Sequence, residues 1–135
     1  MIRVFVDGAS NPNKENSSVG VLIIEDGKQT QIGKKLDGFH ENHQTEYFAF
    51  LYALELLLKD HKNDQLVLCH SDSKMLVDAV NKRFTSNDKY KELLSRSLEL
   101  VSRFSDFHIK WVPEKNNKGA HQLAKNALYS NKKSQ

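Results

Sequence analysis

Residues 2–8 read IRVFVDG, and this stretch begins the pattern that decides the fold. Ile2, Val4 and Val6 alternate with the residues between them, which is the period of a β-strand. Two more strand-like runs follow, VGVLIIED at residues 19–26 and KQTQIGKKL at residues 28–36, joined at an Asp-Gly dipeptide that favours a tight hairpin. The intervening GASNPNKENSS predicts a turn by its composition. The chain is therefore expected to begin with a three-stranded antiparallel meander.

The hydrophobic period changes at Asn42, where apolar residues begin to recur at the spacing of a helix that runs to Lys59. Short apolar strands then alternate with helices. The expected elements are a strand at 65–69, helices at 74–81 and 90–104, a strand at 107–112 and a helix within 116–128. Strands joined by helices lie parallel. We therefore expect an α/β fold with a five-stranded mixed sheet, three antiparallel strands and then two parallel ones, flanked by helices in the order βββαβααβα.

Two side chains, one an indole and the other a thiol, are predicted to be buried. Trp111 follows Ile109 at strand spacing, which favours a place in the core. Cys69 is the only cysteine and lies in the apolar run LVLC, where a thiol is more often a filler than a nucleophile. A lone cysteine suits a reducing cytoplasm, where we expect the protein to act.

Length and composition limit the class of protein. With 135 residues, of which 39% are hydrophobic and 27% charged, the chain fits one domain, expected over residues 1–130 with a basic tail at 131–135. No window has the 18 or so apolar residues of a membrane span, and the first residues do not resemble a signal peptide. We expect a monomer without a membrane partner.

The charge is unevenly distributed along the chain. Residues 1–81 hold 8 Lys and Arg against 12 Asp and Glu, a net charge of −4, whereas residues 82–135 hold 12 against 5, a net charge of +7. Such a pattern is expected where a polyanion lies on one surface and carboxylates gather cations on another, although an ordinary solvated surface gives it too.

Three carboxylates are expected to meet at one edge of the sheet. Asp7 ends the first strand, Asp72 follows the strand at 65–69, and Glu46 lies on the sheet-facing side of the long helix. Taken singly, each has a simpler explanation, as a turn residue, a helix cap or a partner of the helix dipole. Together they would repel one another strongly unless a cation lay between them.

Four motifs in order resemble those of the ribonuclease H type 1 family, and the resemblance extends from residue 1 to about residue 129. They are DGAS at 7–10 followed by Asn11-Pro12, NHQTEY at 42–47, SDSK at 71–74, and Asn117-x-x-Ala120-x-x-Leu123-Ala124. The resemblance implies a ribonuclease H-like fold and an endonuclease that cuts the RNA strand of an RNA–DNA hybrid. It also implies two divalent ions, Mg²⁺ or Mn²⁺, and products with 5′-phosphate and 3′-hydroxyl ends.

The resemblance implies roles for individual residues. Asp7, Glu46 and Asp72 would be the catalytic, metal-binding carboxylates, with Asp7 bridging both ions. The family has a fourth carboxylate where this chain has His121, so His121 would complete the catalytic and metal-binding set. The residues implied in substrate binding are Gly8, Asn11, Asn42, His43, Gln44 and Asn117.

Several departures from the family pattern are expected to weaken activity. A neutral imidazole at His121 suits Mn²⁺ better than Mg²⁺, and activity should fall in mild acid as this side chain takes up a proton. Alternatively, His121 only packs beside the carboxylates. His43 replaces the usual asparagine, residues 83–90 are too short for a basic protrusion, and the loop VPEKNNK is also shortened. Phosphate contacts would then fall to scattered lysines, namely Lys74, Lys89, Lys115 and Lys118.

Two other functions remain open on the sequence alone. The chain could be a catalytically weakened module that binds nucleic acid or a protein partner. It could also be another nuclease or a strand-transfer enzyme on the same fold. The three retained carboxylates favour the ribonuclease.

Overall fold

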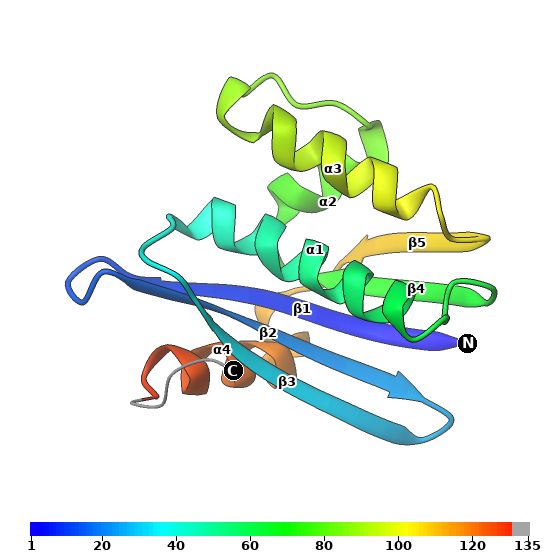
Figure 1. The fold of residues 1–135 in the computed structure, drawn as a ribbon, viewed down its shortest axis with the longest axis horizontal. Helices are drawn as coiled ribbons and strands as arrows, with labels where there is room; N and C mark the ends of the chain where they lie inside the picture. The colour runs from blue at the N-terminus through cyan, green and yellow to red at the C-terminus, as the bar shows by residue number, and fades with distance from the viewer. Residues whose placement is uncertain (131–135) are drawn as a thin grey trace.

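A five-stranded sheet in the order β3-β2-β1-β4-β5 forms the centre of the computed structural model, which describes residues 1–130 (Figure 1). β1 pairs with β2 and β2 with β3 in antiparallel fashion, whereas β1 pairs with β4 and β4 with β5 in parallel fashion. The strands are β1 (Ile2–Asn11), β2 (Asn16–Glu25), β3 (Lys28–Leu36), β4 (Leu66–Ser71) and β5 (Asp106–Trp111). The predicted mixed sheet is confirmed; the predicted basic tail lies outside the described residues.

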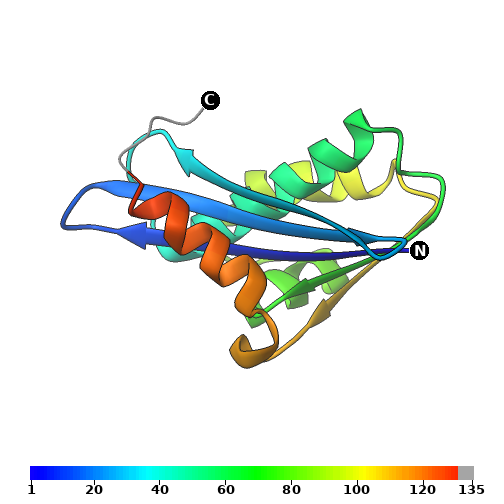
Figure 2. The same cartoon turned by 90° about the horizontal axis from the view of Figure 1, so that it is seen from below.

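The helices cover both faces of this sheet. α1 (Asn42–Lys59), α2 (Lys74–Lys82) and α3 (Lys91–Val101) lie on one face, and α4 (Lys118–Leu128) lies on the other, as the view in Figure 2 shows. Two short 3₁₀ turns, η1 (Asp88–Tyr90) and η2 (Glu114–Asn116), precede α3 and α4. The predicted order of strands and helices is confirmed. Among residues 1–130, no helix has the length and apolarity that a membrane crossing requires.

The core lies between β1 and α1, at the centre of the sheet. The alternating Ile2, Val4 and Val6 of β1 are at most 1% exposed, which confirms the strand period read from the sequence. α1 buries a face against them that includes Ala49, Phe50, Ala53, Leu54 and Leu57. Cys69 is also buried, and burial raises the pKa of its thiol to about 12, as expected of a filler rather than a nucleophile.

The first turn is shorter than its composition predicts. β1 continues to Asn11 and β2 begins at Asn16, so residues 12–15 alone make the connection. Small residues on either side of the turn remain in β1 and β2, where helices pack closely against them. A Cβ on Gly8 would lie 2.3 Å from the Thr45 hydroxyl oxygen, and the buried Ser18 donates a hydrogen bond of 2.5 Å to the carbonyl of Ala124. The second predicted turn, at Asp26-Gly27, is confirmed.

α4 packs directly on two glycines of the sheet. A Cβ on Gly20 would lie 2.2 Å from the carbonyl oxygen of Ala120, and one on Gly33 would lie 2.6 Å from that of Leu123. Both distances are far below van der Waals contact. The backbone of α4 can therefore approach β2 and β3 as closely as it does only because these positions lack side chains.

Trp111 is not in the core, so the prediction made from its strand spacing was wrong. Its side chain is 40% exposed. Trp111 pairs with Ser71 at the last position of the β4–β5 register, where the sheet ends. The Lys74 ammonium lies 5.1 Å from the ring centroid, and the indole nitrogen donates to the main-chain carbonyl of Asp72 at 3.2 Å.

Candidate active site

Asp7 occupies the centre of the sheet at the point where its parallel half ends. β1 pairs in parallel with β4 through the last partners Val6 and Ser71, so Asp7 and Asp72 are the next residues on adjacent strands. The Asp7 side chain is only 3% exposed. Its Oδ2 lies 2.9 Å from Nδ1 of His121 in α4. The two aspartates thus meet as predicted, where the parallel pairing of β1 and β4 ends. The prediction that Asp7 ends the first strand was wrong, because β1 continues to Asn11 in its pairing with β2.

Glu46 is brought to Asp7 by the way α1 begins. Glu41 caps the helix by accepting from the backbone N–H of Gln44, whose side chain accepts in return from the N–H of Glu41. Because Gly8 has no side chain, the first turn of α1 can rest on β1 at Thr45. Glu46 follows immediately and is 7% exposed.

Asp72 completes the group from the end of β4. The turn there is held by the N–H of Ser73, which donates to the Ser71 hydroxyl at 3.0 Å, while the Ser73 side chain caps α2. One ligand atom from each of Asp7, Glu46 and Asp72 lies within 4.8 Å of the others. The predicted cluster of three carboxylates is therefore present.

These carboxylates resist ionisation in the absence of a cation. Burial raises the pKa of Asp7, although the contact with His121 opposes the shift. Burial and the neighbouring charges of Asp7 and Asp72 raise the pKa of Glu46 well above its usual range. Burial, Asp7 and Glu114 raise the pKa of Asp72 to about 6. A positive charge among them would remove much of this cost.

The donor atoms fit a hard divalent cation. Oε2 of Glu46 is buried and has no hydrogen-bond partner within residues 1–130. A buried carboxylate oxygen without a donor is costly, and a cation would satisfy it. Oxygen ligands of this kind are those that Mg²⁺ and Mn²⁺ prefer.

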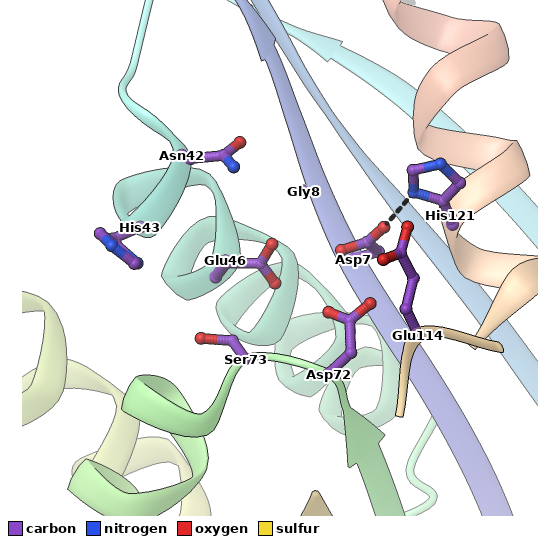
Figure 3. Close-up of a pocket in the computed structure, with 9 residues that line it drawn as sticks. All are labelled: Asp7, Gly8, Asn42, His43, Glu46, Asp72, Ser73, Glu114 and His121. Atoms are coloured by element: carbon purple, nitrogen blue, oxygen red, sulfur yellow. Dashed lines mark hydrogen bonds and ion pairs between the residues drawn. The ribbon is translucent and has the colours of Figure 1, made fainter. Parts of the chain in front are cut away.

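The carboxylates open into a cavity of about 330 Å³. Figure 3 shows their side chains pointing into it from β1, α1 and the end of β4, with His121 and Glu114 on the side of α4. The lining residues are Asp7, Gly8, Asn42, His43, Glu46, Asp72, Ser73, Glu114 and His121. The site is thus a polar, acidic opening at the edge of the sheet.

Residues 5–127 match the model of the reverse transcriptase-like family. Ribonuclease HI of Halobacterium salinarum is 33% identical over 129 residues, which cover 94% of this chain and 64% of that protein. The crystal structure of RNase H1 from the same organism superposes with a TM-score of 0.85 at 29% identity and covers 94% of this chain and 96% of that one. The chain belongs to the ribonuclease H type 1 family.

Two further relatives extend the comparison. EbsB of Enterococcus faecalis is 36% identical over 136 residues, covering 98% of this chain and the whole of that protein. The crystal structure of LC11-RNase H1 in complex with an RNA/DNA hybrid has a TM-score of 0.83 at 22% identity, covers 95% of this chain and 96% of that one, and shares the ribonuclease H fold.

The substrate-binding residues implied by the ribonuclease H family do not all reach the cavity. Gly8, Asn42 and His43 line it. Asn11 lies at the far end of β1 and accepts from the N–H of Asn13, and Gln44 is engaged in the cap of α1.

Asn117, the remaining substrate-binding candidate, is 1% exposed and does not line the cavity. Its side-chain amide donates to the carbonyl of Val6 at 2.9 Å. This contact joins the start of α4 to β1, one residue before Asp7.

His121 lies beside the apolar stripe of α4 rather than in it. Ala120, Ala124 and Leu128 are buried, whereas the His121 side chain is 43% exposed and turns towards Asp7. The stripe follows a spacing of four residues from Ala120, which places position 121 on its border.

Ser73 and Glu114 both line the cavity, although neither was predicted to be a site residue. Ser73 could have been found from its place after Asp72, at the beginning of a helix. Glu114 carried no such signal, because its position depends on how the segment between β5 and α4 crosses the end of β4.

Proposed function

We propose that the protein is a metal-dependent endoribonuclease that hydrolyses the RNA strand of RNA–DNA hybrids. Its family supports ribonuclease H-type activity in general. The observation that carries the finer proposal is the group of Asp7, Glu46 and Asp72, with ligand atoms within 4.8 Å of one another and a buried oxygen that lacks a partner. The hybrid bound by LC11-RNase H1, which has the same fold, is the model for the substrate.

Asp7, Glu46 and Asp72 would hold two divalent ions, either Mg²⁺ or Mn²⁺. Ions bound in this way supply an activated water and stabilise charge on the phosphate and on the leaving oxygen, which yields 5′-phosphate and 3′-hydroxyl ends. The carboxylates must give up the protons that their raised pKa values favour before they can bind a cation. Asp7 lies between the other groups and would hold the ions together with Glu46 and Asp72.

His121 is proposed as the fourth ligand, in the place where the family has a carboxylate. Its Nδ1 lies 2.9 Å from Asp7, so a ring nitrogen of His121 would be placed to help hold an ion beside that carboxylate. A neutral nitrogen donor favours Mn²⁺ over Mg²⁺. If His121 instead only orients Asp7, this metal preference is not expected.

Binding of the RNA strand is proposed at the α1 side of the cavity. Asn42 and His43 are exposed there, and Ser10 donates to the Asn42 side chain at 3.3 Å, which orients the amide. Gly8 lines the same cavity and is proposed to contact the RNA through its backbone. Roles in RNA binding for Asn11, Gln44 and Asn117 are proposed from the family resemblance alone. The monomeric state and the cytoplasmic location remain predictions.

The test is cleavage of a labelled RNA–DNA hybrid, compared with single-stranded and double-stranded RNA, in Mg²⁺ and in Mn²⁺. We expect cleavage of the RNA strand of the hybrid alone, with higher rates in Mn²⁺, and none by Asp7→Asn. Analysis of the product ends checks the reaction type.

A binding module without catalysis is the second candidate, favoured by the charge lost at His121. The same assay separates the two functions. Hybrid that is retained in a gel shift but stays intact in both metals would support the module and refute the nuclease.

A further inference from the structure

The Glu114 carboxylate lies on the same side of the active-site cavity as His121, the position at which the family has a carboxylate. It lines the cavity together with the three carboxylates, and with His121 it also lines an adjoining cavity of about 480 Å³. Figure 3 shows its carboxyl group turned towards the gap between Asp7, Asp72 and His121, opposite Glu46. Glu114 therefore faces the centre of the site from a direction that no other carboxylate of the cavity covers.

The backbone holds Glu114 in this position. It begins the 3₁₀ turn η2 and follows Pro113, whose ring restricts the chain. The turn is closed by the N–H of Asn116, which donates to the Pro113 carbonyl at 2.8 Å, and by that of Asn117, which donates to the Glu114 carbonyl at 2.9 Å. Since the Asn117 side chain is itself bonded to β1, the turn is tied to the strand that carries Asp7.

Glu114 is exposed, but its negative charge adds to the repulsion among the carboxylates of the site. Within residues 1–130 its carboxylate accepts no hydrogen bond and forms no ion pair, and its charge acts on the nearby Asp72. It would also repel a phosphate entering the cavity. A divalent ion held by Glu114 together with the three carboxylates would offset both repulsions.

We propose that Glu114 is a metal ligand and supplies the fourth carboxylate of the site from the segment between β5 and α4. This inference rests on the proposed function, because it concerns the same divalent ions. The donor would be a carboxylate oxygen, so the ion class is Mg²⁺ or Mn²⁺. The set of four carboxylates is thus restored by a residue seven positions before His121.

The experiment measures binding of Mn²⁺ and of Mg²⁺ by isothermal titration calorimetry to metal-free wild type, Glu114→Gln and the matched control Glu92→Gln. Glu92 is an exposed glutamate on α3 that does not line the cavity. We expect Glu114→Gln to weaken the affinity for at least one ion by about tenfold or more, by analogy with the loss of groups around a metal, and Glu92→Gln to bind as wild type. Wild-type affinity in Glu114→Gln overturns the inference.

A second background tests whether Glu114 replaces the missing carboxylate. In His121→Asp the family's own fourth carboxylate is restored, so Glu114→Gln should then change the affinity much less than in wild type. Equal losses in the two backgrounds would show that Glu114 acts independently of position 121 and would refute the replacement. Repeating the titration at high salt separates ligation, which persists, from a distant charge effect, which is screened.

Folding and function are controlled separately. Glu114→Gln removes a repulsive charge, so without metal it should be at least as stable to heat as wild type, and lost binding cannot then reflect unfolding. If wild type binds no divalent ion, even with hybrid present, the proposed nuclease fails as a whole. If wild type binds ions and cuts hybrid, and Glu114→Gln does both equally well, only the role of Glu114 is refuted.

Discussion

Replacing Asp72 by Asn is expected to abolish nuclease activity and yet stabilise the metal-free protein. Asp72 must ionise beside the buried Asp7 and near Glu114, and its pKa is raised from its ordinary 3.8 to about 6. Near neutral pH the folded protein carries the cost of this ionisation, whereas the unfolded chain does not. Asn keeps a similar shape without the charge.

The size of the effect follows from the shift and from the exposure of the side chain. A change in pKa from 3.8 to about 6 corresponds to about 3 kcal/mol at most. Asp72 is half-buried, and solvent screening reduces the value to about 1–1.5 kcal/mol. Removing a negative charge next to the N-terminus of α2 costs about 0.5 kcal/mol. The net stabilisation is about 0.5–1 kcal/mol, or about 2–5 °C in Tm for a chain of this length.

The stabilisation should depend on pH in a defined direction. Between the ordinary pKa and the raised one, the folded state binds more protons than the unfolded state, so wild-type stability falls as the pH rises through this window. The advantage of Asp72→Asn should therefore be full near pH 8, with a chelator present, and vanish near pH 4. Thermal denaturation followed by circular dichroism at both pH values measures it.

Two results would refute this reasoning. One is an Asp72→Asn variant that is less stable than wild type near pH 8 without metal. The other is a gain in stability that is the same at both pH values, which would point to packing rather than charge. Excess Mn²⁺ should reverse the order, because wild type gains binding energy that the variant lacks.

The remaining predictions concern packing, the metal and the nucleic acid. Gly20→Ala should lower the free energy of unfolding by about 1–3 kcal/mol, measured by urea denaturation, because its Cβ would lie 2.2 Å from the Ala120 carbonyl oxygen. Wild-type Tm should rise with Mn²⁺, by the equivalent of about 2.7 kcal/mol at a hundredfold excess over Kd, and that of Asp7→Asn should not. Trp111 is the only tryptophan, and its fluorescence should change when hybrid binds, because the indole contacts the main chain at Asp72. Cleavage in Mn²⁺ should fall as the pH drops through about 6, because burial raises the pKa of Asp72 to about 6 and the protonated carboxyl binds the ion less well, as pH–rate profiles would show.

Each of these has an outcome that contradicts it. Gly119→Ala is the control for packing, since its Cβ would meet only the flexible end of Leu22 at 2.8 Å; equal losses at both glycines would argue against backbone contact at Gly20. An equal rise of Tm in Asp7→Asn would place the ion elsewhere. Unchanged fluorescence at saturating hybrid would separate Trp111 from the site. A cleavage rate that does not fall below pH 6 would separate the ionisation of Asp72 from metal binding.

The sequence predicted the site best where local pattern and topology agree. A strand period fixed the placement of Asp7, a helical period fixed that of Glu46, and the alternation of strands and helices placed β1 beside β4 and hence Asp7 beside Asp72. These inferences needed only the direction of each side chain and the rule for parallel strands.

The features that sequence reasoning missed depend on contacts between distant segments. β1 extends past the predicted turn because α1 and α4 press on its small residues and those of β2. Trp111 has the spacing of a core residue, but it lies at the end of the sheet, where its side chain is exposed. Glu114 reaches the cavity through a turn that is tied to β1 by Asn117. The hydrophobic periodicity of the sequence carries no information about such contacts.

The glycines beneath α4 have a consequence for metal selectivity. His121 sits at the height above the sheet that the bare backbones of Gly20 and Gly33 allow, since α4 rests on them without intervening atoms. A single methyl group added at either glycine would push α4 away from the sheet and move the imidazole away from Asp7. If His121 ligates the ion as proposed, the choice of cation would depend on buried strand residues that do not contact the ion, and a screen for altered metal use should include these positions.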